Sequence, residues 1–194
     1  MTSKQIIIGI IVVAIVALAV YFRRRCLGYR RDALREQMVR LWIEHVDRTR
    51  EFIVATLENL PDADAIGARL QKNQDQIAAL IGAYYGRANE QRLAALLHEH
   101  IDIAAKIVNA YKRSEPAEEL VKTWYKNADE ISNAFKDMNR KFDVSKMMRA
   151  HLDTTAAYLT ARVKKDWGAA VILSDRVIDQ AVHMAHSITD VIRK

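Results

Sequence analysis

The polar residues best suited to chemistry are three histidines on apolar helical stripes. His45, His100 and His151 each continue a run of apolar residues at three- and four-residue steps, and Asn127 does the same. Neutral imidazoles from facing helices are good ligands for zinc, nickel or iron, and a metal held in this way activates a bound thiol or water. One interpretation of these residues is therefore a divalent metal or ligand site.

Two other interpretations compete with a metal site. The same residues are expected either to form a buried hydrogen-bonded network that fixes the helix register, or not to converge at all. The di-iron signature Glu-x-x-His is absent, because Glu44-His45 and Glu99-His100 are adjacent pairs. The sequence also has no phosphate loop, nucleophile elbow or HExxH motif. We therefore predict a buried network, no catalytic residue, no cofactor and a protein that is not an enzyme.

Helices must position these side chains. Six Gly and two Pro among 194 residues leave few helix breakers, and no strand-like alternation is present. Asn73, with Gln76 three residues later, resembles a capping box and predicts a helix start. The patterns predict an all-α, up-down antiparallel bundle of about five main helices. Its helices are expected over 32–59, 62–72, 73–85, 89–112, 117–139, 145–163 and from 167 onward.

A long uncharged segment lies near the N-terminus. Ile6 to Phe22 is 17 residues without a charge and is apolar on all sides. At ~1.5 Å per residue a helix of this length covers ~25 Å, close to the ~30 Å hydrocarbon thickness of a bilayer. A core helix would show one apolar stripe, and a signal peptide would carry its basic cluster before the apolar run. The segment therefore predicts a single transmembrane helix.

A basic cluster follows this segment, and only Lys4 precedes it. The cluster comprises Arg23, Arg24, Arg25, Arg30 and Arg31. The positive-inside rule then predicts an integral membrane protein with its N-terminus across the membrane. Residues 23–194 are expected on the cytoplasmic side or on the matching side of a viral inner membrane, with the bilayer and anionic lipid headgroups as partners. Cys26, the only cysteine, is either an S-palmitoylation site or an unmodified thiol.

The net charge of +6 is unevenly distributed. Residues 1–31 hold six of the 30 Lys and Arg and none of the 24 Asp and Glu, so residues 32–194 are formally neutral. This distribution argues against a nucleic-acid partner. We divide the chain into a transmembrane anchor with its basic flank, residues 1–31, and a helical-bundle domain, residues 32–194.

Several short motifs occur from Leu41 onward. They are LWIEHV at 41–46, LPD at 60–62, RLQKN at 69–73, YG at 85–86, EH at 99–100, WYKNADEI at 124–131, MMRAHL at 147–152 and DW at 166–167. In these motifs the chain resembles a family of small, uncharacterised bacterial proteins, with relatives in large DNA viruses. The resemblance implies a helical bundle and no known activity. The N-terminal anchor departs from the family pattern, as if a soluble bundle had been recruited to a membrane.

Three functions are consistent with these patterns. The first is a membrane-anchored structural or interaction module that holds a protein partner or copies of itself, such as a minor capsid or inner-membrane protein of a virion. The alternative is a metal-dependent bundle enzyme or ligand-binding protein that uses His45, His100 and His151. A membrane signalling module is a third, disfavoured because few residues precede the apolar run.

Overall fold

The computed structural model describes residues 3–192, with the side chains of residues 15–23, 25 and 32–192. Every regular element in this range is helical, so the prediction of an all-α fold is confirmed. The helices are α1 (Ser3–Leu57), α2 (Ala63–Tyr85), α3 (Arg87–Lys112), α4 (Glu118–Met138), α5 (Ser145–Val163) and α6 (Trp167–Ile192). The chain divides into two compact units, Met1–Gln37 and Met38–Lys194, and α1 contributes to both.

The predicted transmembrane helix, and with it the integral-membrane localisation, is wrong. Within the described part of the chain, no helix combines the length and the apolar character that crossing a membrane requires. Residues 6–14 of the predicted span lie outside the residues whose side chains are described.

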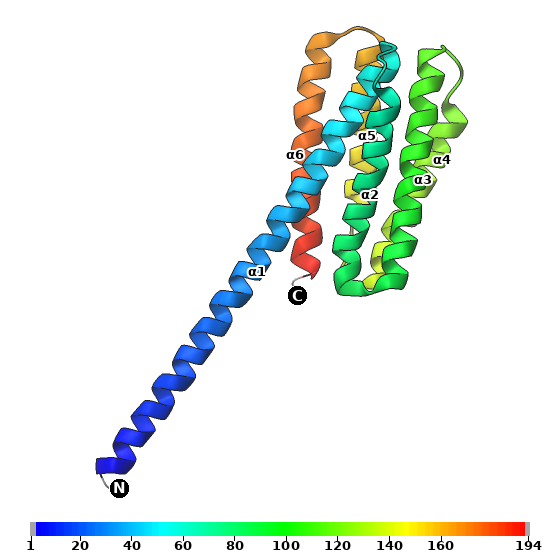
Figure 1. Cartoon of the computed structure of the whole chain (residues 1–194). Coiled ribbons are helices and arrows are strands. Elements are labelled where there is room, and N and C mark those ends of the chain that lie inside the picture. The colour runs from blue at the N-terminus through cyan, green and yellow to red at the C-terminus, as the bar shows by residue number, and fades with distance from the viewer. Residues whose placement is uncertain (1–2, 193–194) are drawn as a thin grey trace. The chain divides into compact units, whose positions relative to one another are not determined.

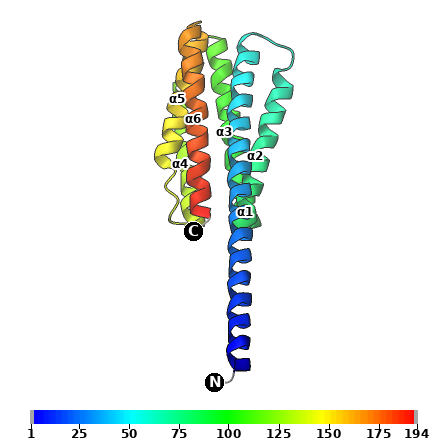
Figure 2. The ribbon, with the colours of Figure 1, turned by 90° about the vertical axis from the view of Figure 1, so that its left-hand side faces the viewer.

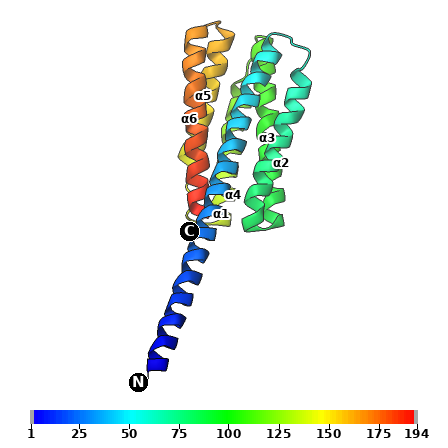
Figure 3. The same ribbon diagram turned by 60° about the vertical axis from the view of Figure 1, so that its left-hand side comes forward.

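The second unit is a bundle whose helices alternate in direction. The pairs α2/α3, α3/α4, α4/α5 and α5/α6 pack side by side (Figure 1). Their connections are short, which makes consecutive helices antiparallel neighbours as the sequence predicts. Figures 2 and 3 show the part of α1 from Met38 onward between α2 and the α5/α6 pair. This position lets α1 contribute side chains to both halves of the bundle.

The bundle encloses one continuous apolar core. Each of its helices places one apolar stripe inward, and burial of a Leu, Ile or Met side chain stabilises the fold by about 1.5–3 kcal/mol. The largest completely buried side chains of this core include Met38, Leu41, Ile77, Ile81, Leu93, Ile131, Phe142, Leu152, Met184 and Ile188. The core therefore lies within the second unit, where it surrounds the histidines.

The predicted helix start at Asn73 is also wrong, because α2 runs unbroken from Ala63 to Tyr85. The Asn73 side chain is completely buried, and its amide donates a hydrogen bond to the Leu41 carbonyl of α1 at 3.0 Å. A side chain with this partner has no need to cap a helix of its own. Asn73, which the sequence suggests as a helix cap, therefore links α2 to α1 instead.

Two helix ends follow the sequence signals. Gly86 alone joins α2 to α3, at a φ of +88° that favours glycine, and its N–H donates to the Gly82 carbonyl at 2.7 Å. Asp166 caps α6, since its carboxylate accepts a hydrogen bond from the Ala169 N–H at 3.0 Å. These two residues set where α3 and α6 begin, and so help to fix the helix register around the core.

Candidate functional site

The structure brings the three histidines together inside the bundle. His45 on α1, His100 on α3 and His151 on α5 are each exposed by 5% or less. The ring centroids of His45 and His151 are 5.7 Å apart, and His100 is near enough to act electrostatically on both. Together with Gln74 and Asn127, which bond to two of them, they form what we call the histidine cluster.

His45 is held by α2. Its Nδ1 lies 3.0 Å from Gln74 Nε2, whose two N–H groups are shared among His45 Nδ1, the Leu70 carbonyl at 3.1 Å and Asn73 Oδ1 at 3.2 Å. Because the Gln74 amide nitrogen can only donate, His45 Nδ1 must accept. The neutral ring therefore carries its proton on Nε2.

His100 is held by α4 with the opposite polarity. Its Nδ1 lies 2.8 Å from Asn127 Oδ1, which can only accept, so His100 donates from Nδ1. The Asn127 amide nitrogen in turn donates to the Leu96 carbonyl and to Glu99 Oε2, each at 3.1 Å. The His100 ring also lies against Trp124, with centroids 5.2 Å apart. Asn127 thus fixes both the tautomer and the orientation of His100.

His151 differs because its Nδ1 is buried without a hydrogen-bond partner among the described residues. Burial, reinforced by repulsion from His100, lowers its pKa to about 3. Burial lowers the pKa of His100 to about 4, against an opposing contribution from the Asn127 hydrogen bond. The pKa of His45 also lies well below its ordinary value, through burial first and then repulsion from His151 and His100. All three rings are therefore neutral at pH 7.

The hydrogen bonds of the cluster run to side-chain amides, to main-chain carbonyls and, from Asn127, to the Glu99 carboxylate. His45 and His100 each bond to a side-chain amide, and neither relays a proton to a carboxylate. In the part of the chain that the structure describes, no group of three or more His, Cys, Asp or Glu residues is arranged to hold a metal ion. The arrangement links α1 to α2 and α3 to α4 through buried polar contacts.

Sequence reasoning missed Gln74, the donor that fixes His45. Gln74 continues the α2 stripe of Leu70, Ile77 and Ile81, and it is 1% exposed. That spacing could have identified it, but the helix break predicted at Asn73 separated it from Leu70. The error came from giving a local capping signal more weight than a helix-length stripe.

A small cavity lies beside the cluster. It has a volume of about 40 Å³, and its walls include Thr49, Trp124 and Thr155. Thr49 and Thr155 follow His45 and His151 by one helical turn, and the Trp124 ring contacts His100. The cavity therefore adjoins the cluster along the bundle axis.

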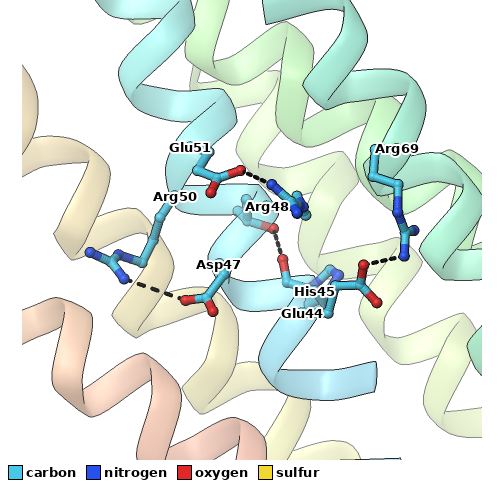
Figure 4. Close-up of polar contacts among 8 residues, drawn as sticks. Glu44, His45, Asp47, Arg48, Arg50, Glu51 and Arg69 are labelled. Atoms are coloured by element: carbon cyan, nitrogen blue, oxygen red, sulfur yellow. Dashed lines mark hydrogen bonds and ion pairs between the residues drawn. The ribbon is translucent and has the colours of Figure 1, made fainter. Parts of the chain in front are cut away.

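The charges near His45 on α1 pair with neighbours. Figure 4 shows Arg48 with Glu51 at 2.5 Å, Arg50 with Asp47 at 3.5 Å, and Glu44 reaching Arg69 on α2. Exposed pairs of this kind contribute about 0–1 kcal/mol each. Their main consequence is that this stretch of α1 presents little net charge.

The N-terminal candidates are described only in part. The side chains of Cys26, Arg24, Arg30 and Arg31 lie outside the described residues, so lipidation at Cys26 stays a prediction. Arg23 and Arg25 are exposed. The eight residues before Arg23, residues 15–22, are all apolar and all exposed; we call them the apolar segment.

Comparisons of this chain with protein-family models, with curated proteins and with solved structures gave no match. The resemblance to uncharacterised bacterial and viral bundle proteins therefore stays a prediction that rests on the motifs alone.

Proposed function

We propose that this protein is a non-catalytic interaction module, in which the apolar segment binds a protein partner and the bundle is a rigid scaffold. The exposure of the apolar segment carries this proposal. Its six large side chains, from Ile15 to Phe22, are each 45–60% exposed. Apolar side chains that are exposed consecutively along a helix are typical of a surface that a partner covers.

The charges next to the segment indicate the chemistry of the partner. Arg23 and Arg25 are exposed directly after Phe22. The complementary surface is a groove with an apolar floor and acidic residues at one end. Two parallel copies of this chain would instead bring these arginines against each other, which disfavours a second copy as the partner.

The interior of the bundle supports a scaffold without catalysis. Its histidines are neutral, two of them bond to amides, and all three are almost completely buried. The buried hydrogen bonds of His45 to Gln74 and of His100 to Asn127 favour one helix register over others.

The test is site-specific photo-crosslinking in cells that express the full chain. A benzoylphenylalanine at Leu18 is compared with one at Lys122, whose side chain on α4 is 72% exposed. The expected result is a discrete protein adduct at Leu18 that is absent at Lys122 and is lost in R23E/R25E. Adducts only with a second copy, only with lipid, or the same at both sites would overturn the proposal.

A further inference from the structure

Exposed apolar side chains flank the turn between α5 and α6, at one end of the bundle (Figure 1). Val163 ends α5 and is 37% exposed, and Trp167 begins α6 and is 47% exposed. Val171 and Ile172, about one turn further along α6, are exposed by 64% and 56%. We call these four residues the hairpin patch. Large apolar side chains that gather in one exposed place are typical of a surface that another molecule covers.

The Trp167 ring is held in its exposed position by Arg162. The guanidinium carbon of Arg162 lies 4.7 Å from the centroid of the Trp167 ring, and the same guanidinium reaches Glu58 on the turn after α1 at 3.7 Å. A cation over one face of an indole ring stabilises that ring orientation. The remaining surface of the ring is therefore presented to the outside in a fixed position.

The charges of the turn indicate the chemistry of the partner. Lys164 and Lys165 are both exposed, and neither forms an ion pair with another residue of the described chain. Asp166 is the one acid within residues 162–172, and its carboxylate accepts the hydrogen bond from the Ala169 N–H. Lys165 has a φ of +59°, so the turn carries a charged side chain where the backbone favours glycine. Two ammonium groups beside an apolar patch are complementary to an anionic partner.

The size of the hairpin patch argues against a protein partner. Four side chains that are each about half exposed present on the order of 400 Å², roughly half of the ~800 Å² that each side of a standard protein interface buries. A second copy in a symmetric contact would also bring Lys164 and Lys165 against the same residues of the other chain. A shallow and anionic surface fits both the area and the charge.

We propose that the hairpin patch binds the surface of an anionic membrane at the level of the lipid headgroups. Lys164 and Lys165 contact the anionic headgroups, and Trp167 lies at the boundary between headgroups and acyl chains, which is the position that Trp favours. From Trp167 to Ile172 the helix rises about 7.5 Å, within the ~5–10 Å to which interfacial helices bury their apolar face. Asp175 is exposed beyond Ile172 and ends the apolar surface.

This inference goes beyond the proposed protein partner of the apolar segment. The hairpin patch lies within the second unit of the chain, and the apolar segment lies within the first. Either surface can therefore bind its partner without the other. The experiment has to report on Trp167 itself, so that binding through the apolar segment is recognised as a different result.

The probe is a vesicle of phosphatidylcholine and phosphatidylserine in a roughly three-to-one mixture, with brominated acyl chains that quench tryptophan fluorescence on contact. Trp42 and Trp124 are each 4% exposed, so Trp167 is the tryptophan that lipid can reach in the full chain. We expect saturable quenching that Trp167→Phe abolishes. Because each basic residue near anionic lipid strengthens binding about fivefold, vesicles of phosphatidylcholine alone should bind roughly twentyfold more weakly.

Two pairs of variants test the charges and the apolar contact separately. Lys164→Glu with Lys165→Glu should weaken binding at least about twentyfold. Its matched control is Lys122→Glu with Lys126→Glu, which makes the same change of net charge on α4, at side chains that are 72% and 78% exposed. This control should weaken binding by about twofold or less, because these residues lie outside the patch.

Val171→Ser with Ile172→Ser removes apolar surface at exposed positions, so the fold should be kept while quenching is lost. Tyr84→Ser, at a residue that is 54% exposed near the end of α2, is the control and should quench like the wild type.

Equal quenching by both kinds of vesicle, or quenching that neither patch variant weakens, would overturn the proposal. Vesicle binding without quenching of Trp167 would also overturn it, since the contact would then lie elsewhere, as at the apolar segment. A change of emission with protein concentration, seen without vesicles and abolished by Trp167→Phe, would identify a second copy as the occupant and overturn it in the same way.

Discussion

At the scale of single residues, the histidine cluster shows two ways of placing a polar ring in an apolar interior. His100 Nδ1 donates a hydrogen bond to Asn127 Oδ1, so each of these two atoms has a buried partner. His151 Nδ1, in contrast, lacks a partner among the described residues. The apolar stripes were enough to predict the burial of all three histidines. Their partners were not predictable in the same way, because they depend on which face of α2 or α4 meets the histidine.

This difference between two histidines predicts opposite effects of one substitution. His100→Leu should lower the free energy of unfolding by about 1–3 kcal/mol, because it leaves Asn127 Oδ1 buried without its donor. His151→Leu removes an unpartnered nitrogen and adds apolar volume, so its effect should be neutral or stabilising. Urea unfolding at pH 7.5 measures both. Equal losses in the two variants would show that cavity shape outweighs hydrogen bonding.

The buried histidines also predict a pH dependence of stability. Unfolded histidine titrates near its ordinary pKa of 6.5, while the folded pKa is about 4 for His100 and about 3 for His151. Between these values the unfolded chain binds more protons, so the free energy of unfolding is highest above pH 6.5 and falls as the pH drops toward 4 and then 3. At ~1.4 kcal/mol per pKa unit, the contribution of His100 is on the order of 3 kcal/mol.

The check is urea unfolding at pH 7.5, 5.5 and 4.5, with His151→Leu as the matched variant. Carboxylates also titrate near pH 4, so the useful quantity is the difference between wild type and variant. The variant should lose less stability on acidification, because one of the titrating rings is gone. Parallel pH profiles would mean that His151 is as easily protonated in the folded as in the unfolded state.

At the scale of elements, the α2–α3 hairpin shows that sequence patterns predict where a helix ends but not how closely it approaches its neighbour. The end of α2 was predictable because Gly86 is the residue that its backbone conformation favours. The close approach of the two helices was not, because it depends on the absent side chain of Gly82. A Cβ at Gly82 would lie 2.4 Å from the Cβ of Glu90 on α3. No pattern in α2 alone identifies that neighbour.

Gly82→Ala should therefore destabilise the bundle, although alanine is normally the better helix former. The clash involves a Cβ held close to the α3 backbone, so the helices must separate, at a cost of about 1–3 kcal/mol. Gly168→Ala is the control, since its nearest neighbouring atom, Asp166 Oδ1, is 3.8 Å away. That change should raise stability by up to about 1 kcal/mol. Thermal unfolding of both variants decides, and a stabilised Gly82→Ala would contradict the close approach.

At the scale of the whole molecule, composition predicted the fold correctly, whereas the uncharged segment Ile6–Phe22 led to a wrong prediction of a membrane span. Low Gly and Pro content and helical stripes predicted the all-α bundle, because many weak helix preferences add up along a chain. The transmembrane prediction instead rested on Ile6–Phe22 alone, of which the structure describes the side chains from Ile15 onward. Within the described chain, no helix meets the requirements of a membrane span.

The division into two units predicts that the bundle folds without the N-terminal segment. Every residue of the apolar core cluster lies between Met38 and Ile188. A fragment of residues 32–194 should therefore unfold cooperatively, with a Tm within about 4 °C of that of the full chain. Its start at Asp32 leaves one and a half turns of α1 before the core and places an acidic residue at the new helix N-terminus, which the helix dipole favours. Differential scanning calorimetry tests this, and a fragment with no cooperative transition would mean that residues 1–31 contribute to folding.

Because the fragment carries 24 basic and 24 acidic residues, it should also lose the retention on a cation exchanger at pH 7.5 that the +6 charge gives the full chain. Retention by the fragment would instead reveal a local basic face on the bundle, a surface that the net charge alone does not show.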